Sequence, residues 1–174
     1  MPSATSYTTP TNARTEFISE PPAVPSPRDK KLHAPVVSIV LPMYNEEENL
    51  APMLRELIQA GDLLNTSYEI IIVDDGSTDE LKAEIKPYLE ALPGVLKYVE
   101  LARNFGQSAA MAAGLDIAEG RYIVTLDGDL QNDPADIPQM LTKLVEDDLD
   151  MVIGWRQNRQ DKVLNRKIPS WIAN

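Results

Sequence analysis

Short apolar runs alternate with amphipathic segments along most of this chain. Five runs have the length of a strand and are rich in β-branched residues, at residues 36–41, 69–73, 95–101, 122–126 and 151–153. The segments between them place apolar residues three and four positions apart, as on one face of a helix. Such repeated alternation predicts an α/β fold, a mostly parallel sheet with helices on both faces.

Helices are expected around residues 50–58, 81–89, 107–118 and 137–145. Ser77 or Thr78 can cap the second of these helices. Gly120 follows the third helix as a common stop signal. Pro52 and Pro87 fall inside the first two patterns, so each of those helices should start late or kink, because proline lacks a backbone donor.

Residues 1–34 differ in composition from everything that follows. They are rich in Ser, Thr and Pro with almost no aliphatic pattern, which predicts a disordered tail. Residues 35–174 are then expected to form one domain, since a chain of 174 residues is long enough for a single full core. No run approaches the ~20 apolar residues of a membrane span, and the N-terminus lacks the apolar core of a secretory signal, so we expect a cytoplasmic chain.

The charge balance narrows the classes of partner. A net charge of −11 argues against a nucleic-acid binder, because phosphate contacts need a basic surface. The absence of cysteine excludes a disulfide framework and a thiolate zinc site. Residues 156–167 are positively charged in this otherwise acidic chain, with five Lys or Arg and one acidic residue. That segment is either a solvated helix face or a surface that binds phosphate.

Polar residues follow the strands at the edge where a parallel sheet binds ligands. Asp and Glu side chains recur there in residues 44–48, 74–79 and 127–131. Asp127 and Asp129 face the same side if extended geometry continues past the strand, and Gln131 keeps the alternation. Carboxylates suit Mg²⁺ or Mn²⁺, which complete their coordination with substrate phosphates, so a nucleoside diphosphate is the natural partner. The alternative is that Asp-Gly-Asp is only a turn.

Two further residues at this edge have more than one interpretation. Tyr44 can stack on a base or sugar, or pack in the core. Asp75 can accept hydrogen bonds from a base or ribose, while residues 74–77 can also form a turn followed by a helix cap. These roles of the Asp-Asp-Gly-Ser segment can coexist.

Several motifs, in order, resemble glycosyltransferase family 2. Residues 38–50 (SIVLPMYNEEENL) and 72–79 (IVDDGSTD) look like its opening signatures, and Asp127-Gly128-Asp129 takes the place of its metal-binding Asp-x-Asp motif. Residues 103–107 (RNFGQ) and 126–134 (LDGDLQNDP) are similar to the polyprenyl-phosphate branch, which includes dolichol-phosphate mannose synthases and bacterial polyprenyl-phosphate glucosyltransferases. The resemblance covers nearly all of residues 36–174, and several motifs together are more specific than any one.

The resemblance implies a GT-A nucleotide-sugar fold, which is Rossmann-like. It also implies an inverting transfer of a hexose from a UDP- or GDP-sugar to a polyprenyl phosphate, undecaprenyl or dolichyl, on the cytoplasmic face of the membrane. Mg²⁺ or Mn²⁺ is the implied cofactor, and a membrane surface is an implied partner. The acceptor is already an anion, so electrostatic positioning rather than a strong base should supply most of the catalysis.

The resemblance also assigns roles to residues of this sequence. The nucleoside is expected to be held by Pro42, Tyr44, Glu46, Val73 and Asp75. The metal ligands are expected to be Asp127, Asp129 and Gln131, with Gly128 beside the diphosphate. Arg156 and Arg166 match the family's phosphate-binding arginines, and together with Asp129 they are the expected catalytic residues.

The family continues beyond the position of Asn174. We therefore expect this chain to hold the donor half of the catalytic domain and to lack part of the acceptor half. Four apolar residues near the end share a helical face beside basic residues, a pattern that suits either a membrane surface or packing on the domain. They are Leu164, Ile168, Trp171 and Ile172.

Three other functions stay open at this level, and so does the oligomeric state. A family 2 enzyme can use the hydroxyl of a growing glycan as acceptor, with a carboxylate base later in the sequence. The chain can also be a non-catalytic module that binds nucleotide sugars. A phospho-receiver domain shares the doubly wound sheet and an acidic Mg²⁺ site, but it needs an acidic pair after the first strand and a lysine after the fifth. Residues 42–45 (PMYN) and 154–156 (GWR) stand there instead.

Overall fold

The computed structural model describes residues 35–154. Its elements follow one another as β1 (Val37–Met43), α1 (Glu47–Leu63), β2 (Tyr68–Asp74), α2 (Leu81–Glu84), α3 (Lys86–Ala91), β3 (Leu96–Glu100), α4 (Gln107–Ile117), β4 (Tyr122–Thr125), the 3-10 helix η1 (Pro134–Asp136) and α5 (Ile137–Glu146). The expected disordered tail at residues 1–34 lies outside the described residues, as does the basic segment 156–167.

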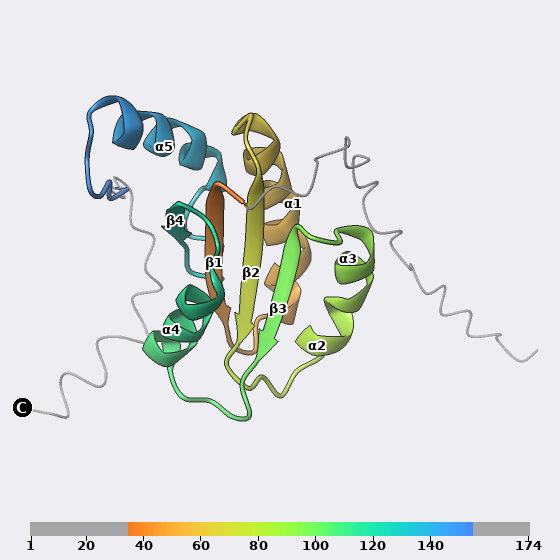
Figure 1. Ribbon diagram of the computed structural model, residues 1–174. Coiled ribbons are helices and arrows are strands. Elements are labelled where there is room, and N and C mark those ends of the chain that lie inside the picture. The colour runs from red at the N-terminus through yellow and green to blue at the C-terminus, as the bar shows by residue number, and fades with distance from the viewer. Residues whose placement is uncertain (1–34, 155–174) are drawn as a thin grey trace, which may run out of the picture.

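The strands form one parallel sheet in the order β3-β2-β1-β4. All seven residues of β1 and of β2 are buried, because these two strands lie in the middle of the sheet with helices on both sides. Figure 1 shows α4 on one face of the sheet and α1 on the other, with α2 and α3 beside β3. The predicted α/β class and the helices on both faces are confirmed.

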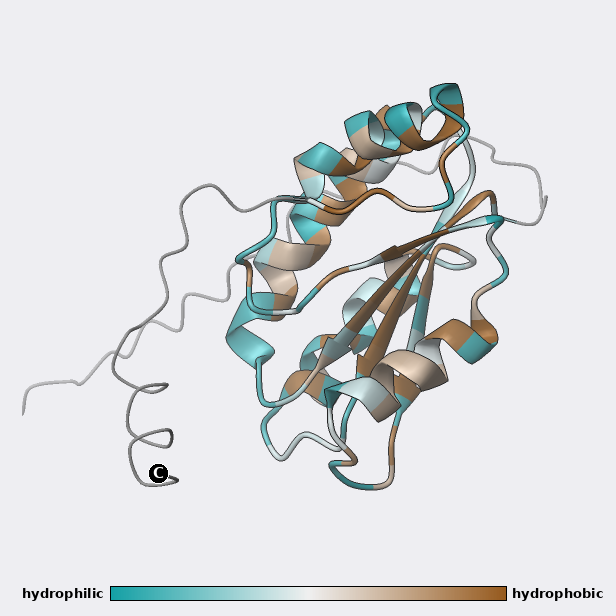
Figure 2. Ribbon diagram, turned by 90° about the vertical axis from the view of Figure 1, so that its left-hand side faces the viewer, coloured by the Kyte–Doolittle hydropathy of each residue, from teal (hydrophilic) through white to brown (hydrophobic). Residues whose placement is uncertain are grey.

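Two apolar cores separate the layers. The larger lies under α1 and includes alternate strand residues such as Ile39, Leu41 and Ile70. The smaller lies under α4, where Val40, Ile71 and Val73 meet Ala110. Figure 2 shows the strands as a hydrophobic slab between helices with polar outer surfaces. Alternate side chains of each strand point to opposite faces, so both faces must be covered.

Proline affects two helices in different ways. α1 begins at Glu47 and runs through Pro52, so the expected late start is wrong. Pro52 removes one bond to the carbonyl of exposed Glu48, at a cost of about 3 kcal/mol. Burial of Leu50, Met53, Leu54 and Leu57 contributes about 1.5–3 kcal/mol for each side chain, which outweighs that cost.

The predicted helix 81–89 forms as two short helices. α2 ends at Glu84, and α3 carries Pro87 in its first turn, where a missing N–H costs little. Neither Ser77 nor Thr78 caps α2, because the N–H of Leu81 bonds to Asp79 Oδ1 instead, at 3.2 Å. The Ala-rich helix before Gly120 is confirmed as α4.

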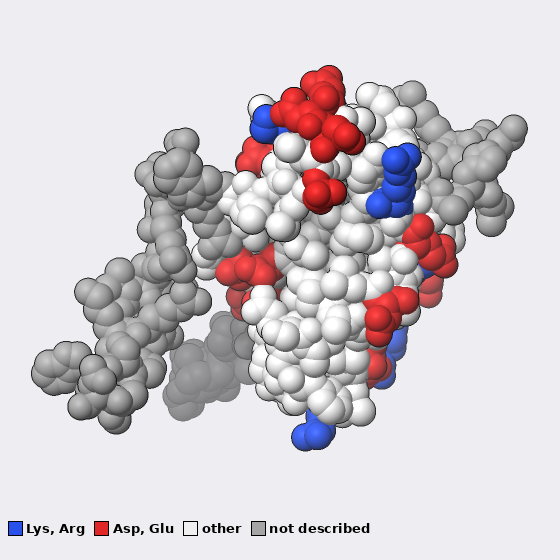
Figure 3. Space-filling view, turned by 60° about the vertical axis from the view of Figure 1, so that its left-hand side comes forward, with Lys and Arg blue, Asp and Glu red and all other residues white. Residues whose placement is uncertain are grey.

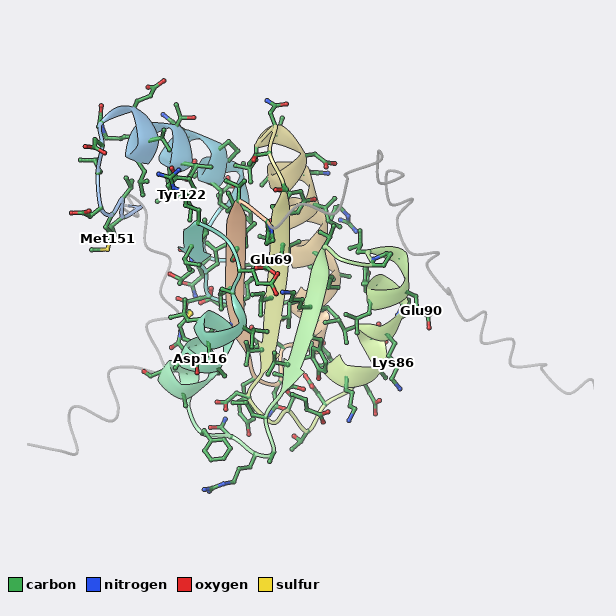
Figure 4. All side chains as sticks on the ribbon, in the orientation of Figure 1. Glu69, Lys86, Glu90, Asp116, Tyr122 and Met151 are labelled. Atoms are coloured by element: carbon green, nitrogen blue, oxygen red, sulfur yellow. The ribbon has the colours of Figure 1, made fainter. Side chains whose placement is uncertain are left out.

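The strand expected at residues 151–153 does not form. Met151 and Ile153 are 70 % and 79 % exposed, and Val152 and Gly154 lie beside α5, which also carries Met140. A strand needs a neighbour for its N–H and C=O groups, and residues 151–153 pair with none of the strands described. Figure 4 shows Met151 at the outer side of the molecule.

The end of α5 carries an acidic cluster of its own. Residues 146–150 include Glu146, Asp147, Asp148 and Asp150, and Figure 3 shows acidic side chains gathered at that end of the molecule. Lys143 pairs with Asp147 at 2.6 Å one helical turn away. These acids lie at the amino end of the strands, so they are separate from the acids that follow the strands.

Candidate functional site

The loops after β1 and β2 are joined by hydrogen bonds at the carboxyl edge of the sheet. Asn45 donates its N–H to Ser77 Oγ at 3.0 Å, and its side-chain oxygen accepts from the Thr78 N–H at 2.7 Å. Slightly further along both loops, Asp79 Oδ2 accepts the N–H of Glu47 at 2.9 Å, and Glu47 Oε2 accepts the N–H of Glu80. These reciprocal bonds give the edge a well-defined rim. They also account for the left-handed backbone of Asn45, whose φ is 53°.

Asp74, the last residue of β2, supports this rim from below. It is buried, and its Oδ1 accepts the N–H of Ser77 at 2.7 Å. Its Oδ2 accepts the hydroxyl of Tyr98 on β3 at 2.6 Å. Burial and the hydrogen bond to this carboxylate raise the pKa of Tyr98, so the phenol stays protonated and keeps donating.

Asp75 holds the loop that follows β3. It is only 3 % exposed, and its two oxygens accept the N–H groups of Phe105 and Gly106, each at 2.8 Å. The neighbouring Gly76 has a φ of 70°, and a Cβ there would overlap the backbone of Arg103. In this structure Asp75 therefore fixes the position of residues 103–106.

The loop presents an aromatic ring and a cation at the rim. Phe105 is 52 % exposed, and the Arg103 guanidinium lies 4.6 Å from the centre of its ring. Tyr44, at the end of β1, is 43 % exposed. Two aromatic rings are thus open to a flat ligand group at the edge, which agrees with the stacking interpretation of Tyr44 rather than with core packing.

The Asp-Gly-Asp segment is a turn and not a continuation of β4. The last ladder bond runs from the Leu126 N–H to the Val40 carbonyl at 3.1 Å. The next bond would need an N–H from Pro42, which has none, so pairing ends there. Leu130 has a φ of 58°, and the Gln131 N–H returns to Asp129 Oδ1 at 3.1 Å. The expected alternation of Asp127, Asp129 and Gln131 along one strand face is therefore wrong.

The turn nevertheless brings both aspartates near Glu46. Burial, together with the charges of Asp129 and Asp127, raises the pKa of Glu46. Glu46 Oε2 is shielded from solvent and has no hydrogen-bond partner among the residues described. The same oxygen would lie only 2.5 Å from a Cβ on Gly128, so a side chain at that position would displace Glu46. Three carboxylates from two loops therefore share one small region.

These residues fit a divalent cation that is shared with a ligand. Within residues 35–154, no group of three or more His, Cys, Asp or Glu side chains is arranged to hold a metal by itself. Mg²⁺ and Mn²⁺ are commonly held by one or two carboxylates and complete their coordination with phosphates and water. The shielded oxygen of Glu46 shows that negative charge here is poorly compensated. A cation held by Asp127 and Asp129 would offset that charge.

The other residues expected at the site lie in the sheet, on the turn after β4 or outside the described residues. Pro42 and Val73 lie inside the sheet, and Val73 is fully buried under α4, so its side chain does not reach the edge. Gln131 lies on the turn with an exposed side chain. Arg156 and Arg166 lie outside the described residues, so their expected roles with Asp129 have no structural counterpart in this structure.

Sequence reasoning placed Gln107 in the motif at residues 103–107 but gave it no role in the site. The side-chain amide of this first residue of α4 donates to Asp127 Oδ1 at 2.6 Å. Glycine before a helix predicts a loop-to-helix junction, and Gly106 has the positive φ of 95° that such a junction uses. That pattern locates the start of the helix but does not show that the helix reaches the turn after β4.

Comparison with known proteins supports one family. The family model described as glycosyl transferase family 2 matches residues 38–173. A dodecaprenyl-phosphate galacturonate synthase of Rhizobium johnstonii is 49 % identical over 138 residues, which are 79 % of this chain and 41 % of that protein. An undecaprenyl-phosphate 4-deoxy-4-formamido-L-arabinose transferase of Sodalis glossinidius is 43 % identical over 131 residues, which are 75 % of this chain and 40 % of that protein. The chain thus spans about two fifths of the length of these curated relatives.

Solved structures show the same fold at lower identity. A mannosyltransferase from Pyrobaculum calidifontis, in complex with GDP-Man and Mn²⁺, has a TM-score of 0.56 and 24 % identity, covering 65 % of this chain and 33 % of that one. TarS 1–349 of S. aureus in complex with UDP has a TM-score of 0.53 and 24 % identity, covering 71 % of this chain and 38 % of that one. These similarities confirm the GT-A type of parallel sheet with helices on both faces.

Proposed function

The chain belongs to glycosyl transferase family 2, and from that premise we propose that it transfers a hexose from a UDP- or GDP-sugar to a polyprenyl phosphate. Two observations support polyprenyl phosphate as the acceptor. Relatives that are 49 % and 43 % identical are named for polyprenyl-phosphate substrates, dodecaprenyl and undecaprenyl. The motifs at residues 103–107 and 126–134, which belong to the same branch by resemblance, lie next to each other at the site through Gln107 and Asp127.

One observation carries the proposal. Glu46, Asp127 and Asp129 gather at the carboxyl edge of the sheet, where the pKa of Glu46 is raised and one of its oxygens is shielded with no hydrogen-bond partner in residues 35–154. Such a charge arrangement is poorly stable alone and becomes favourable when a cation and a diphosphate enter together. The site is therefore suited to a nucleoside diphosphate that brings a metal ion.

The residues take the following roles in the proposal. Asp127 and Asp129 hold Mg²⁺ or Mn²⁺, which when bound neutralises the diphosphate as leaving group. Gly128 lets the turn that carries both aspartates approach Glu46 closely, and Tyr44 offers a ring to the nucleoside. Asp75 shapes the nucleoside pocket through the loop that it holds.

The acceptor requires little from the protein beyond placement. A polyprenyl phosphate already carries the attacking oxygen as an anion, so the described site needs no strong general base. Arg156 and Arg166 are assigned to the phosphates of donor or acceptor because guanidinium groups bind phosphate oxygens in pairs. Attack from the side opposite the diphosphate inverts the anomeric carbon.

The acceptor chemistry places the reaction at a membrane surface. A polyprenol chain partitions into the bilayer, so the enzyme meets it from the cytoplasmic side while its donor stays in water. Within residues 35–154, none of the helices is long and apolar enough to cross a bilayer.

Calorimetric titration tests the donor site first. UDP, GDP, UDP-glucose and GDP-mannose are each added with and without Mn²⁺. We expect one base to be preferred, with binding that Mn²⁺ strengthens, and we expect this gain to be lost in Asp127→Ala. Asp116→Ala, which removes an exposed acid of α4, should bind like the wild type. Binding that is indifferent to Mn²⁺ and to Asp127 would overturn the metal-diphosphate site.

A second assay tests the acceptor. Release of nucleoside diphosphate from the preferred donor is followed after adding undecaprenyl phosphate or a free oligosaccharide. We expect release with the lipid phosphate. Release with the oligosaccharide alone would instead indicate a glycan-forming enzyme, and binding without any release would indicate a non-catalytic module.

A further inference from the structure

We propose that Gln107 is a positioning residue, which sets the orientation of Asp127 toward the cation and couples the metal side of the site to the nucleoside side. This inference rests on the proposed function, because it concerns how the same donor site is built. It assigns a task to a residue outside the expected nucleoside, metal and phosphate contacts.

The contact itself is specific. Gln107 Nε2 donates to Asp127 Oδ1 at 2.6 Å, which is short for a bond between an amide and a carboxylate. The two residues lie twenty positions apart in the chain, Gln107 at the start of α4 and Asp127 in the turn after β4. A donor on one carboxylate oxygen limits rotation of the group, so the direction of the remaining lone pairs is set before a cation arrives.

The neutral amide suits this task better than a charged donor. An amide leaves the full negative charge of Asp127 available to a cation, whereas a lysine at the same place would compensate that charge and compete with the metal. Glu46 and Asp127 lie close enough for their negative charges to repel each other. A neutral donor holds the carboxylate in position against that repulsion.

The backbone of Gln107 is held from the opposite side of the site. The two N–H groups just before it, those of Phe105 and Gly106, both bond to buried Asp75 at 2.8 Å. Behind it, α4 packs on β1 and β2 through Ala110 and Gly114, which meets Val40 and Val73. Gln107 is thus a fixed support between Asp75, at the end of β2, and Asp127, in the turn after β4.

This placement predicts coupling between the two ligands. A nucleoside that contacts residues 103–106 restrains the same segment that orients Asp127, so nucleotide and cation should strengthen each other's binding. Residues that orient metal ligands typically change metal affinity by about 10–100-fold when they are replaced. We expect loss of the Gln107 amide to fall at the lower end of this range, because the contact lies near the surface.

The test uses the whole chain and measures Mn²⁺ binding by electron paramagnetic resonance. Mn²⁺ is titrated alone, with UDP and with GDP, into the wild type, Gln107→Met and Gln107→Asn. Ser108→Ala is the matched control, because Ser108 is an exposed residue in the same turn of α4. Thermal unfolding of every variant checks that the fold is intact. Affinity for UDP and GDP without metal is measured separately.

We expect Gln107→Met to weaken Mn²⁺ binding about 10-fold in the presence of the preferred nucleotide, while metal-free nucleotide binding and the melting temperature stay near the wild-type values. Gln107→Asn keeps the amide on a shorter side chain and should recover part of the loss.

The outcomes separate this inference from the proposed function. If the wild type binds Mn²⁺ with nucleotide and Gln107→Met binds it equally well, the inference is overturned and the proposed function stands. If Gln107→Met weakens Mn²⁺ and metal-free nucleotide binding to the same extent, Gln107 has only a structural role and the inference is also overturned. If the wild type binds no Mn²⁺ with either nucleotide, the metal-dependent function fails and the inference fails with it.

Discussion

At the scale of single residues, a group of buried polar contacts outside the site surrounds Glu69. This side chain is 1 % exposed near the amino end of β2, and Figure 4 shows it on the sheet away from the site loops. Its Oε1 accepts from Ser38 Oγ and from the Glu119 N–H, and its Oε2 pairs with Lys97 at 2.7 Å. One carboxylate thus ties β1, β2, β3 and the loop before β4, so its charge state matters for the fold.

We expect Glu69→Gln to lower the free energy of unfolding by about 1–3 kcal/mol at pH 7. Burial alone raises the pKa of Glu69, but hydrogen bonds from Lys97, Ser38 and Glu119 outweigh burial and hold it below its usual value. Because the pKa of Glu69 is lower in the folded protein than in the unfolded chain, its charge stabilises the fold at any pH above the unfolded-state pKa near 4.5. That stability is lost as the pH falls through the folded-state pKa.

Urea denaturation at pH 7 and pH 3.5 measures this effect. The wild type should lose more stability than Glu69→Gln on acidification, so the two should approach each other. Glu90→Gln, at an exposed position of α3 marked in Figure 4, is the control and should behave like the wild type. Equal losses in Glu69→Gln and wild type would contradict the prediction.

The pKa of Glu46 is shifted in the opposite direction from that of Glu69. Burial and the charges of Asp129 and Asp127 raise its pKa, so the folded protein holds this proton more tightly than the unfolded chain. The folded protein therefore loses stability as the pH rises from the unfolded-state pKa of about 4.5 through the higher folded-state pKa. In chelated buffer, Glu46→Gln should melt at a higher temperature than wild type at pH 7, with the difference shrinking at pH 4. A less stable Glu46→Gln at pH 7 would show that Glu46 is well compensated without ligand.

At the scale of elements, the position of α4 decides the geometry of the site. Gly114 lies against the sheet, where a Cβ would overlap Val40 and lie 2.9 Å from Val73 Cγ2. Both valines are fully buried and branched, so neither can move aside cheaply. This glycine lets α4 lie close enough to the sheet for Gln107 to reach Asp127.

Gly114→Ala should therefore destabilise the protein although alanine is the better helix former. The gain in helix propensity is about 1 kcal/mol, while overpacking a close-packed core costs about 1–3 kcal/mol. We expect a net loss in urea denaturation together with weaker Mn²⁺ binding in the presence of nucleotide, because α4 must move outward. Asp116→Ala, on the exposed side of the same helix, should change stability by less than about 0.5 kcal/mol. A more stable Gly114→Ala would mean that α4 tolerates the shift.

At the scale of the whole molecule, charge makes stability depend on ligands. The chain carries a net charge of −11, and several acids lie together at the carboxyl edge of the sheet. Repulsion among them weakens the compact state until cations bind. A ligand that binds only the folded protein stabilises it by an amount set by its concentration relative to Kd.

Mn²⁺ and the preferred nucleoside diphosphate, added as one complex at about a hundred times its Kd, should raise the melting temperature by about 10 °C, which corresponds to about 2.7 kcal/mol. Differential scanning fluorimetry measures the shift, and EDTA should reverse it. Asp129→Ala should remove the shift, while Asp147→Ala in the acidic end of α5 should keep it. A shift that persists in Asp129→Ala would place the metal elsewhere.

Local sequence pattern determined most of the architecture. Strand-length apolar runs and helical spacing need only the period of the side chains, so β1 to β4, α1, α4 and α5 were predictable, as was the acidic edge. The strand at residues 151–153 was wrong because a strand depends on a partner that no short run specifies. Family motifs likewise pointed to the donor site, because their residues recur in a definite order.

Tertiary structure alone decided how the site residues meet. Pro42 ends the pairing of β4 with β1, which turns Asp127 and Asp129 toward Glu46 instead of along a strand. The bonds of Asp75 to Phe105 and Gly106 and of Gln107 to Asp127 join segments thirty and twenty positions apart. Sequence determines the period and the chemistry of each segment, whereas contacts between distant segments depend on how closely the layers pack and on which backbone groups remain to be paired.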